Sequence, residues 1–182
     1  MDEGWPSVPD ADLTADGWER VDRSADAVFQ LPTAEVTART VVYEDGDLRE
    51  RLDDDVTRFV FATALSFQPP LMAGVGPMIE STVTRQAKRR FAGDLRERGF
   101  EDLTSRDQGE IRVGGTKASL SNVRATYELS TASFDVTGWL AVWRDDGFRL
   151  AGGAYPAAGP GIEGGAAERY RAELLDLVRA VN

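Results

Sequence analysis

The stretch from Val56 to Phe67 constrains the fold more than any other part of the sequence. Its odd-numbered positions bring Phe59 and Phe61 to one side of an extended backbone. Its even-numbered positions bring Val60 and Ala62 to the other side. Because successive residues of a strand point to opposite faces, this strand is apolar on both faces. We therefore expect it in the middle of a sheet that other elements cover above and below.

Two amphipathic helices are predicted. The first follows the turn Gly74-Val75-Gly76-Pro77, because proline is favoured at the first helical position, and it ends at Gly99, a favoured C-terminal cap. Its apolar stripe recurs every four residues: Ile79, Val83, Ala87, Phe91 and Leu95. The second helix runs from about Ala166 to Val181, and its apolar face consists of Tyr170, Leu174, Leu177, Val178 and Val181.

Most of the remaining chain has the character of β-strands. Short strands are expected between Trp18 and Leu31, around a turn at Asp22 to Ala25, and another strand from Val36 to Glu44. Leu48 to Asp55 fits either a short helix or an extended loop. Further strands are predicted at Phe100–Ser105, Gly109–Val113, Lys117–Leu129, Phe134–Trp143 and Phe148–Tyr155. A change of apolar phase near Ser121-Asn122 predicts a β-bulge there.

The order of these elements favours an α+β fold. We expect a mostly antiparallel, twisted sheet of about six to seven strands with helices covering both faces, an α/β/α sandwich. Residues 1–16 are predicted as a loose N-terminal arm, and residues 17–182 as a single domain. From residue 18 to 181 the element order resembles the sandwich of the PsbP-like extrinsic photosystem proteins and of a nuclear import factor that binds the Ran GTPase. This resemblance concerns the fold only and implies no functional residues.

The composition excludes several kinds of chemistry. Without cysteine or histidine, the chain has no disulfides, no thiolate or imidazole metal site, and no Ser-His-Asp or Cys-His centre. The net charge is −10, and Lys88 and Lys117 are the only lysines among 21 basic residues. This acidic, arginine-rich surface resembles that of an uncharacterised haloarchaeal family. Proteins in high salt tolerate a surplus of carboxylates, because the salt screens the repulsion between them. An acidic mesophilic protein is the alternative.

We expect a cytoplasmic protein. Residues 1–6 have neither the basic nor the apolar region of a secretory signal, and no run approaches the roughly 18 apolar residues that a membrane helix needs. The acidic surplus gives little support to nucleic-acid binding through phosphate neutralisation. The expected partner is therefore an unknown protein or small ligand, and neither nucleic acid nor a membrane; a homodimer stays open.

Three aromatic residues are the predicted ligand-binding residues. Trp139 and Trp143 share one face of a strand, and Tyr155 is expected nearby. Together they are suited to line a pocket for an apolar or flat ligand. The alternative is core packing beneath a helix, the more frequent environment of tryptophan in such a strand.

A basic cluster on the first predicted helix is the second candidate site. It consists of Arg85, Lys88, Arg89 and Arg90, on the side away from the apolar stripe. Such a cluster is suited to an anion or to an acidic partner. The alternative is a solvated helix face whose cations offset nearby carboxylates.

Carboxylates offer the remaining route to catalysis. Asp53-Asp54-Asp55 lacks the glycine and glutamate spacing of a calcium loop, so a halophilic acidic loop explains it. Four other acidic residues lie on predicted strands, where chance proximity is expected: Glu101, Asp102, Glu110 and Glu128. We therefore predict no catalytic residues, no metal and no cofactor.

The sequence favours a non-enzymatic binding or protein-interaction module of a halophilic cytoplasm. Two alternatives remain: an enzyme that uses carboxylates or a divalent metal, and a structural dimerisation domain. Acidic residues with raised pKa values in a deep pocket favour the enzyme, and a large apolar surface patch favours the dimer.

Overall fold

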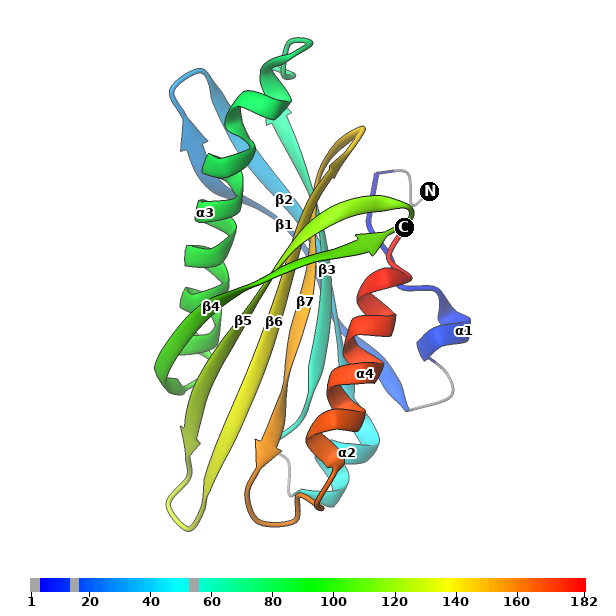
Figure 1. Cartoon of the computed structure of the whole chain (residues 1–182), viewed down its shortest axis with the longest axis vertical. Helices are drawn as coiled ribbons and strands as arrows, with labels where there is room; N and C mark the ends of the chain where they lie inside the picture. Colours follow the sequence, from blue (N-terminus) through cyan, green and yellow to red (C-terminus); the bar gives the residue numbers. More distant parts are fainter. Residues whose placement is uncertain (1–3, 14–16, 53–55) are drawn as a thin grey trace.

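The computed structural model describes residues 4–13, 17–52 and 56–182. Within them, seven strands form one antiparallel sheet in the order β1-β2-β3-β7-β6-β5-β4 (Figure 1). The strands are β1 (Trp18–Leu31), β2 (Ala34–Asp45), β3 (Phe59–Gln68), β4 (Phe100–Val113), β5 (Thr116–Glu128), β6 (Ser133–Asp145) and β7 (Gly147–Ala158). The helices are α1 (Asp10–Leu13), α2 (Gly46–Arg51), α3 (Val75–Glu97) and α4 (Ala166–Arg179). The predicted α+β class is confirmed.

Strand β3 lies inside the sheet, as its two-sided apolar pattern predicts. It pairs with β2 along one edge and with β7 along the other. Val60 and Ala62 on one face are completely buried. On the opposite face Phe59 is buried, but Phe61 and Leu65 are only half-buried. The covering of this second face is therefore incomplete beyond Phe59.

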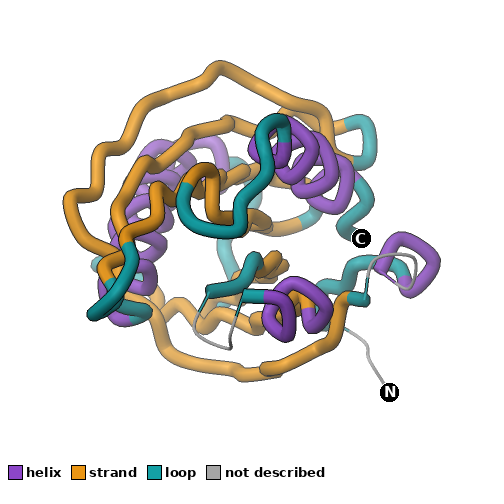
Figure 2. The backbone as a smooth tube through the Cα atoms, turned by 90° about the horizontal axis from the view of Figure 1, so that it is seen from below, coloured by secondary structure: helices purple, strands orange, loops and turns teal. Residues whose placement is uncertain are grey.

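The two long helices contribute to different parts of the core. From α4, Tyr170 and Leu174 join Val60 of β3 in one cluster of buried side chains, termed the α4 cluster. From α3, Phe91 joins Phe59 in a second cluster, termed the α3 cluster. The predicted stripe of α3 is buried from Val83 to Leu95 and half-buried at Ile79. The sheet runs between the two helices in Figure 1, and Figure 2 shows how strongly it curves.

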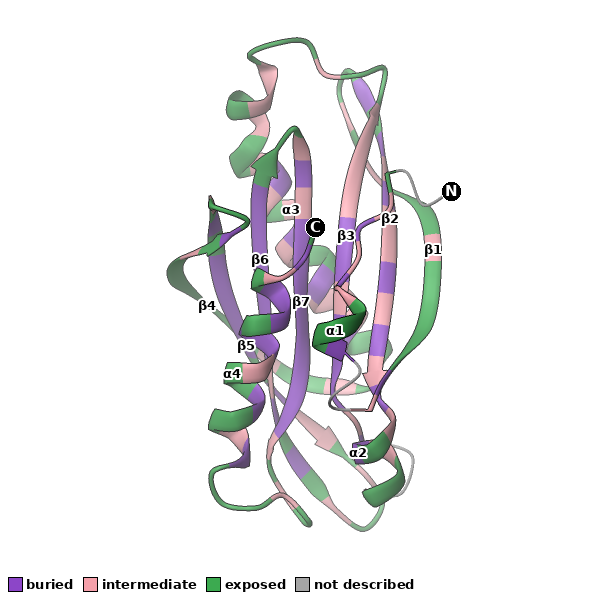
Figure 3. Cartoon of the chain, turned by 90° about the vertical axis from the view of Figure 1, so that its right-hand side faces the viewer, coloured by how far each residue is buried: buried purple, intermediate pink, exposed green. Residues whose placement is uncertain are grey.

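Burial follows the position of each strand in the sheet. The central strands β6 and β7 are buried along most of their length, whereas the edge strand β1 is largely exposed (Figure 3). Both edge strands are also irregular. Four register shifts interrupt their pairing: Arg20/Asp22 and Ala27/Phe29 in β1, and Glu101/Thr104 and Asp107/Glu110 in β4. At each shift the edge strand carries the additional residue.

The β-bulge predicted in β5 lies instead on β4, opposite this part of β5. The pairing of β5 with β6 has no shift. Ala118 and Leu120 belong to the α4 cluster, whereas Val123 belongs to the α3 cluster. The apolar phase of β5 changes because its two ends contribute side chains to different core clusters.

Two breaks predicted between short strands are absent. Trp18–Leu31 is a single strand, because pairing with β2 along its whole length overrides the turn signal at Asp22 to Ala25. Phe100–Val113 is also a single strand. Of the two alternatives for the charged stretch after Asp45, the structure has the short helix α2.

The described part of the predicted N-terminal arm is packed rather than loose. Val8 and Leu13 are buried in the α4 cluster. The backbones of Ser7 and Asn182 exchange two hydrogen bonds of 3.3 and 3.2 Å, so the segment lies beside the other terminus. The division into an arm and a domain stays a prediction. Across the described helices, none has both the length and the apolar character required to cross a membrane.

Candidate functional site

A hollow of ≈410 Å³ lies between α3 and the first three strands; it is termed the α3 chamber. It lies on the face of β3 where Phe61 and Leu65 are only half-buried. Its floor is made of apolar side chains from the strands and α3: Ala38, Val42, Phe59, Phe61, Leu65, Ala87, Phe91, Leu140 and Leu150. The floor combines aliphatic side chains with aromatic rings and is suited to contact an apolar ligand.

The floor is apolar with one internal exception. The rings of Phe61 and Phe91 contact each other with centroids 5.6 Å apart and an interplanar angle of 44°. Beside them, the hydroxyls of Thr40 and Thr63 share a hydrogen bond of 2.9 Å between β2 and β3. One hydroxyl donates to the other in this bond, and neither carries a charge.

Exposed and half-buried polar side chains of β1 and α3 surround the entrance to the chamber. On β1, Asp22, Ser24 and Asp26 alternate along the strand and therefore share one face. From α3 and its C-cap come four residues at helical spacing: Arg90, Asp94, Glu97 and Arg98. A polar rim around an apolar floor is typical of small-molecule sites.

Both arginines of the rim already have partners. Arg90 Nε lies 3.1 Å from Asp94 Oδ1. Arg98 Nη1 donates to Glu44 Oε1 at 3.3 Å, and its guanidinium lies 4.0 Å from the centroid of the Phe59 ring. The two contacts of Arg98 hold the C-terminal end of α3 against β2 and β3.

Burial dominates the electrostatics at the rim. It raises the pKa of the Asp94 carboxyl above its ordinary value, although the positive charge of Arg90 acts in the opposite direction. Burial also lowers the pKa of the Arg98 guanidinium. The carboxylate of Asp94 is thus incompletely stabilised by the charges around it.

The predicted aromatic residues lie on the other side of the sheet. Trp139, Trp143 and Tyr155 are buried in the α4 cluster, with exposed fractions of 3–4%. Trp139 Nε1 donates to the Tyr155 hydroxyl at 3.0 Å, and the Arg171 guanidinium lies 5.0 Å from the Trp139 ring centroid. These residues line neither the α3 chamber nor the open groove on the other side of α3. Their role in ligand binding stays a prediction.

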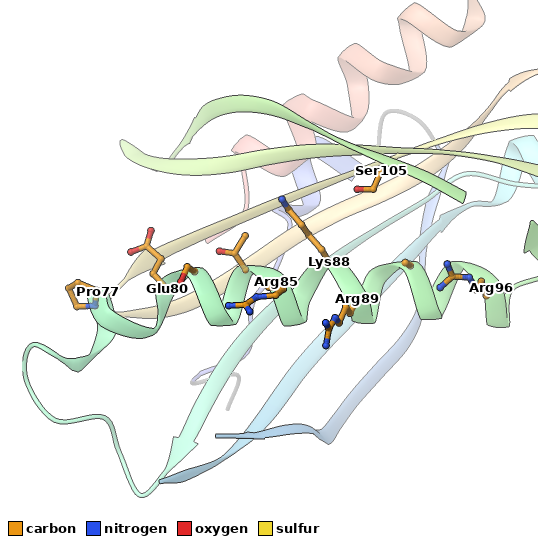
Figure 4. Close-up of a pocket in the computed structure, with 10 residues that line it drawn as sticks. Pro77, Glu80, Arg85, Lys88, Arg89, Arg96 and Ser105 are labelled. Carbon is orange, nitrogen blue, oxygen red and sulfur yellow. The ribbon is translucent and has the colours of Figure 1, made fainter. Parts of the chain in front are cut away.

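The predicted basic cluster is divided between two sides of α3. Arg85, Lys88 and Arg89 line an open groove of ≈920 Å³ that extends to Ser105 of β4 (Figure 4). In this view Lys88 extends from the helix toward β4, where it forms an ion pair with Asp107. Arg90 lies on the other side of the helix and lines the α3 chamber. The cluster is therefore not one continuous patch.

The carboxylates weighed for catalysis are not gathered in one place. Glu101, Asp102, Glu110 and Glu128 are all exposed. In the part of the chain that the structure describes, no group of three or more acidic side chains is placed to hold a metal ion. The Asp53-Asp54-Asp55 run lies outside the described residues.

The most deeply buried charge belongs to a fully paired network. Arg58 Nε donates to Asp45 Oδ2 at 2.7 Å, and Arg58 Nη1 forms an ion pair with Glu173. The guanidinium lies 4.8 Å from the Trp18 ring centroid and 4.6 Å from that of Tyr170. Burial alone would lower the pKa of Arg58, but the bonds to Glu173 and Asp45 raise it on balance. This network joins β2 and α4 through Arg58, which directly precedes β3.

The α3 chamber was not predicted from the sequence, although two signals point to it. Phe61 and Leu65 give β3 a second apolar face that needs a cover. Arg90, Asp94 and Arg98 follow one another at helical spacing beside the apolar stripe of α3. Their common face becomes visible only when α3 is placed over β3.

Comparison with known protein families finds a match over nearly the whole chain. The model of a protein family described as a domain of unknown function matches residues 5–182. No curated protein and no solved structure matches the chain.

Proposed function

We propose that this chain, which belongs to the DUF6517 family of unknown function, is a non-enzymatic module that binds a small ligand in the α3 chamber. One observation carries this proposal: Phe61 and Leu65, on a strand inside the sheet, face the hollow half-buried. Apolar side chains at such positions are normally covered by the protein itself. A ligand with an apolar body would complete their burial.

The size and lining of the chamber support the proposal. Its ≈410 Å³ falls within the range of about 300–1,000 Å³ that is usual for small-molecule sites. Transfer of apolar surface out of water contributes about 25 cal/mol per Å² and supplies the driving force. The rim fixes the orientation of the ligand.

The cellular setting is also part of the proposal. An acidic, arginine-rich surface supports a halophilic cytoplasm as the environment and a haloarchaeal origin for the chain. The presence of α3 and α4 in different clusters supports an α/β/α sandwich with both faces covered, similar to the PsbP-like arrangement. An enzyme that uses carboxylates and a dimerisation domain remain the alternatives.

Filling the chamber tests the proposal. We expect the protein to bind the neutral apolar dye N-phenyl-1-naphthylamine with an increase in fluorescence. Leu65→Trp is expected to weaken this binding at least about tenfold, a loss of about 1.4 kcal/mol, because the larger ring occupies the chamber. The measurement is a fluorescence titration at low salt and at molar KCl.

The matched control is Phe67→Trp. Phe67 lies two residues further along the same strand, contacts the Phe148 ring and does not line the chamber. Dye affinity should therefore stay close to that of the original protein. Absence of dye binding by the folded original protein, or equal loss in both variants, contradicts the proposal.

One further observation favours a second candidate function, the docking of an acidic protein segment on the groove beside α3. Arg85, Arg89 and Arg96 line this groove, and within the described ranges none of them forms an ion pair. On a chain with a net charge of −10, such cations are the local feature that attracts an acidic partner.

Poly-L-glutamate is the probe for this second function. Arg85→Glu combined with Arg89→Glu is expected to weaken its binding at low salt about tenfold or more, because two attractions become repulsions. Arg20→Glu with Arg124→Glu changes the net charge equally at exposed positions away from the groove. Equal effects of the two double variants on binding, measured by fluorescence anisotropy, count against the groove as a docking site.

A further inference from the structure

We infer that the α3 chamber selects ligands that have a positively charged head group and an apolar body. This inference rests on the proposed function, because it names the class of ligand for the same site. It follows from the charges at the rim and from the aromatic rings of the floor.

The rim has more carboxylates than cations. Four acidic side chains line the chamber, from Asp22 and Asp26 of β1 to Asp94 and Glu97 of α3, against two arginines. Both arginines are already engaged within the protein, Arg90 by Asp94 and Arg98 by Glu44. Each arginine thus already has an acidic partner within the protein, and Arg98 shares its partner Glu44 with Arg49.

The remaining carboxylates form no ion pair within the described residues, although Arg98 acts on Asp22 at longer range. Asp22 accepts a hydrogen bond of 3.0 Å from the Ser24 hydroxyl, which supplies no positive charge. Asp26 and Glu97 are exposed at the rim. A cationic head group would gain from all three charges, whereas an anionic head group would be repelled by them.

The partial burial of Asp94 also favours a cationic ligand. This carboxyl is half-buried next to the apolar floor. The rise in its pKa comes first from burial, which disfavours the charged form. A cation placed at the rim would stabilise the carboxylate, and an anion would oppose it.

The floor of the chamber is also suited to a cation. Three phenylalanine rings belong to the floor, Phe59, Phe61 and Phe91, and Phe29 of β1 also lines the chamber. The faces of aromatic rings attract cations, and quaternary ammonium groups in particular are bound in this way. The guanidinium of Arg98, which lies over the Phe59 ring, is an instance within the chain itself. An ammonium head group near the entrance would make contacts of the same kind.

Three ligands with the same octyl chain test the inference. Octyltrimethylammonium, n-octanol and octyl sulfate are each used below their aggregation concentrations to displace N-phenyl-1-naphthylamine from the full chain. At low salt the cation is expected to displace the dye at a concentration at least about fivefold lower than the alcohol, and octyl sulfate to be the weakest. Molar KCl should reduce this order, because salt screens exposed charges. Circular dichroism in each buffer verifies that the protein stays folded.

Charge-neutral variants connect the preference to the rim. Asp26→Asn combined with Glu97→Gln should reduce the preference for the cation over the alcohol to less than about half. The control, Glu101→Gln with Glu110→Gln, removes the same net charge at exposed positions outside the chamber. It should leave the preference unchanged.

The outcomes separate the two proposals. If the alcohol or the sulfate binds as tightly as the cation, or if both double variants act equally, the charge selection is wrong while the apolar site stands. If no dye binds to the folded protein, the proposed function fails, and the inference fails with it.

Discussion

Replacement of Arg58 by methionine is expected to lower the free energy of unfolding by about 3–5 kcal/mol, which is the usual cost of breaking a buried ion pair from one side. The Arg58 side chain is 8% exposed, and its partners Asp45 and Glu173 are 6% and 29% exposed. Without the guanidinium these carboxylates lose their counter-charge in a poorly solvated place. The rings of Trp18 and Tyr170 lose the cation between them as well.

A second consequence of this change arises at Asp45. Its Oδ1 accepts a hydrogen bond of 3.0 Å from the Leu48 amide and so caps α2, while its Oδ2 holds Arg58. Loss of Arg58 therefore also weakens the start of α2. We expect α2 to lose protection from amide hydrogen exchange before the sheet does.

The measurement is urea denaturation followed by circular dichroism at fixed KCl concentration. The control is Arg179→Met on α4, which removes an exposed ion pair with Asp176 and should cost less than about 1 kcal/mol. A variant of Arg58 as stable as this control contradicts the role of the network. If Arg58→Met does not fold at all, Arg58→Lys, which keeps the charge but loses one of the two carboxylate contacts, should fold with intermediate stability.

Replacement of Gly153 by alanine is expected to destabilise the protein by about 3 kcal/mol, at the upper end of the cost of overpacking. A Cβ atom at this position would lie 2.0 Å from the Phe59 carbonyl oxygen and 2.9 Å from Leu174 Cδ1. The first of these atoms belongs to the backbone of β3 and cannot move without opening the ladder between β3 and β7. Gly153 is thus required where β3 and β7 pass beneath α4.

Thermal denaturation measures this effect. For a chain of this size, about 3 kcal/mol corresponds to a decrease in Tm of about 6–12 °C. The matched control lies on the same strand: a Cβ atom at Gly147 would meet no heavy atom within 4 Å. Gly147→Ala should leave Tm nearly unchanged, and a similar decrease for both variants means that close approach of the backbones is not the cause.

The fold was predictable to the extent that it follows from local patterns. The two-sided apolar pattern of β3, the four-residue period of α3, and the turn at Asp145-Asp146-Gly147 each correspond to the structure. These features depend on residues that are close in sequence. The single strands β1 and β4 were not predictable in this way, because pairing with a distant neighbour determines their continuity.

The α3 chamber was not predictable for a related reason. Trp139 and Trp143 attract attention in a sequence because tryptophan often binds ligands, yet here a helix is present to cover them. Phe61 and Leu65 give an ordinary pattern of buried residues. Whether α3 covers them depends on where it crosses a curved sheet, which no local pattern specifies.

The irregular edges of the sheet bear on the behaviour of the protein in concentrated salt. Like charges on exposed strands discourage one sheet from adding to another, but dissolved ions weaken that repulsion. The additional residues in β1 and β4 interrupt the regular spacing of backbone donors and acceptors, and no ion concentration removes this obstacle. At molar salt, protection against aggregation would therefore rest on the shape of these two strands more than on their charge.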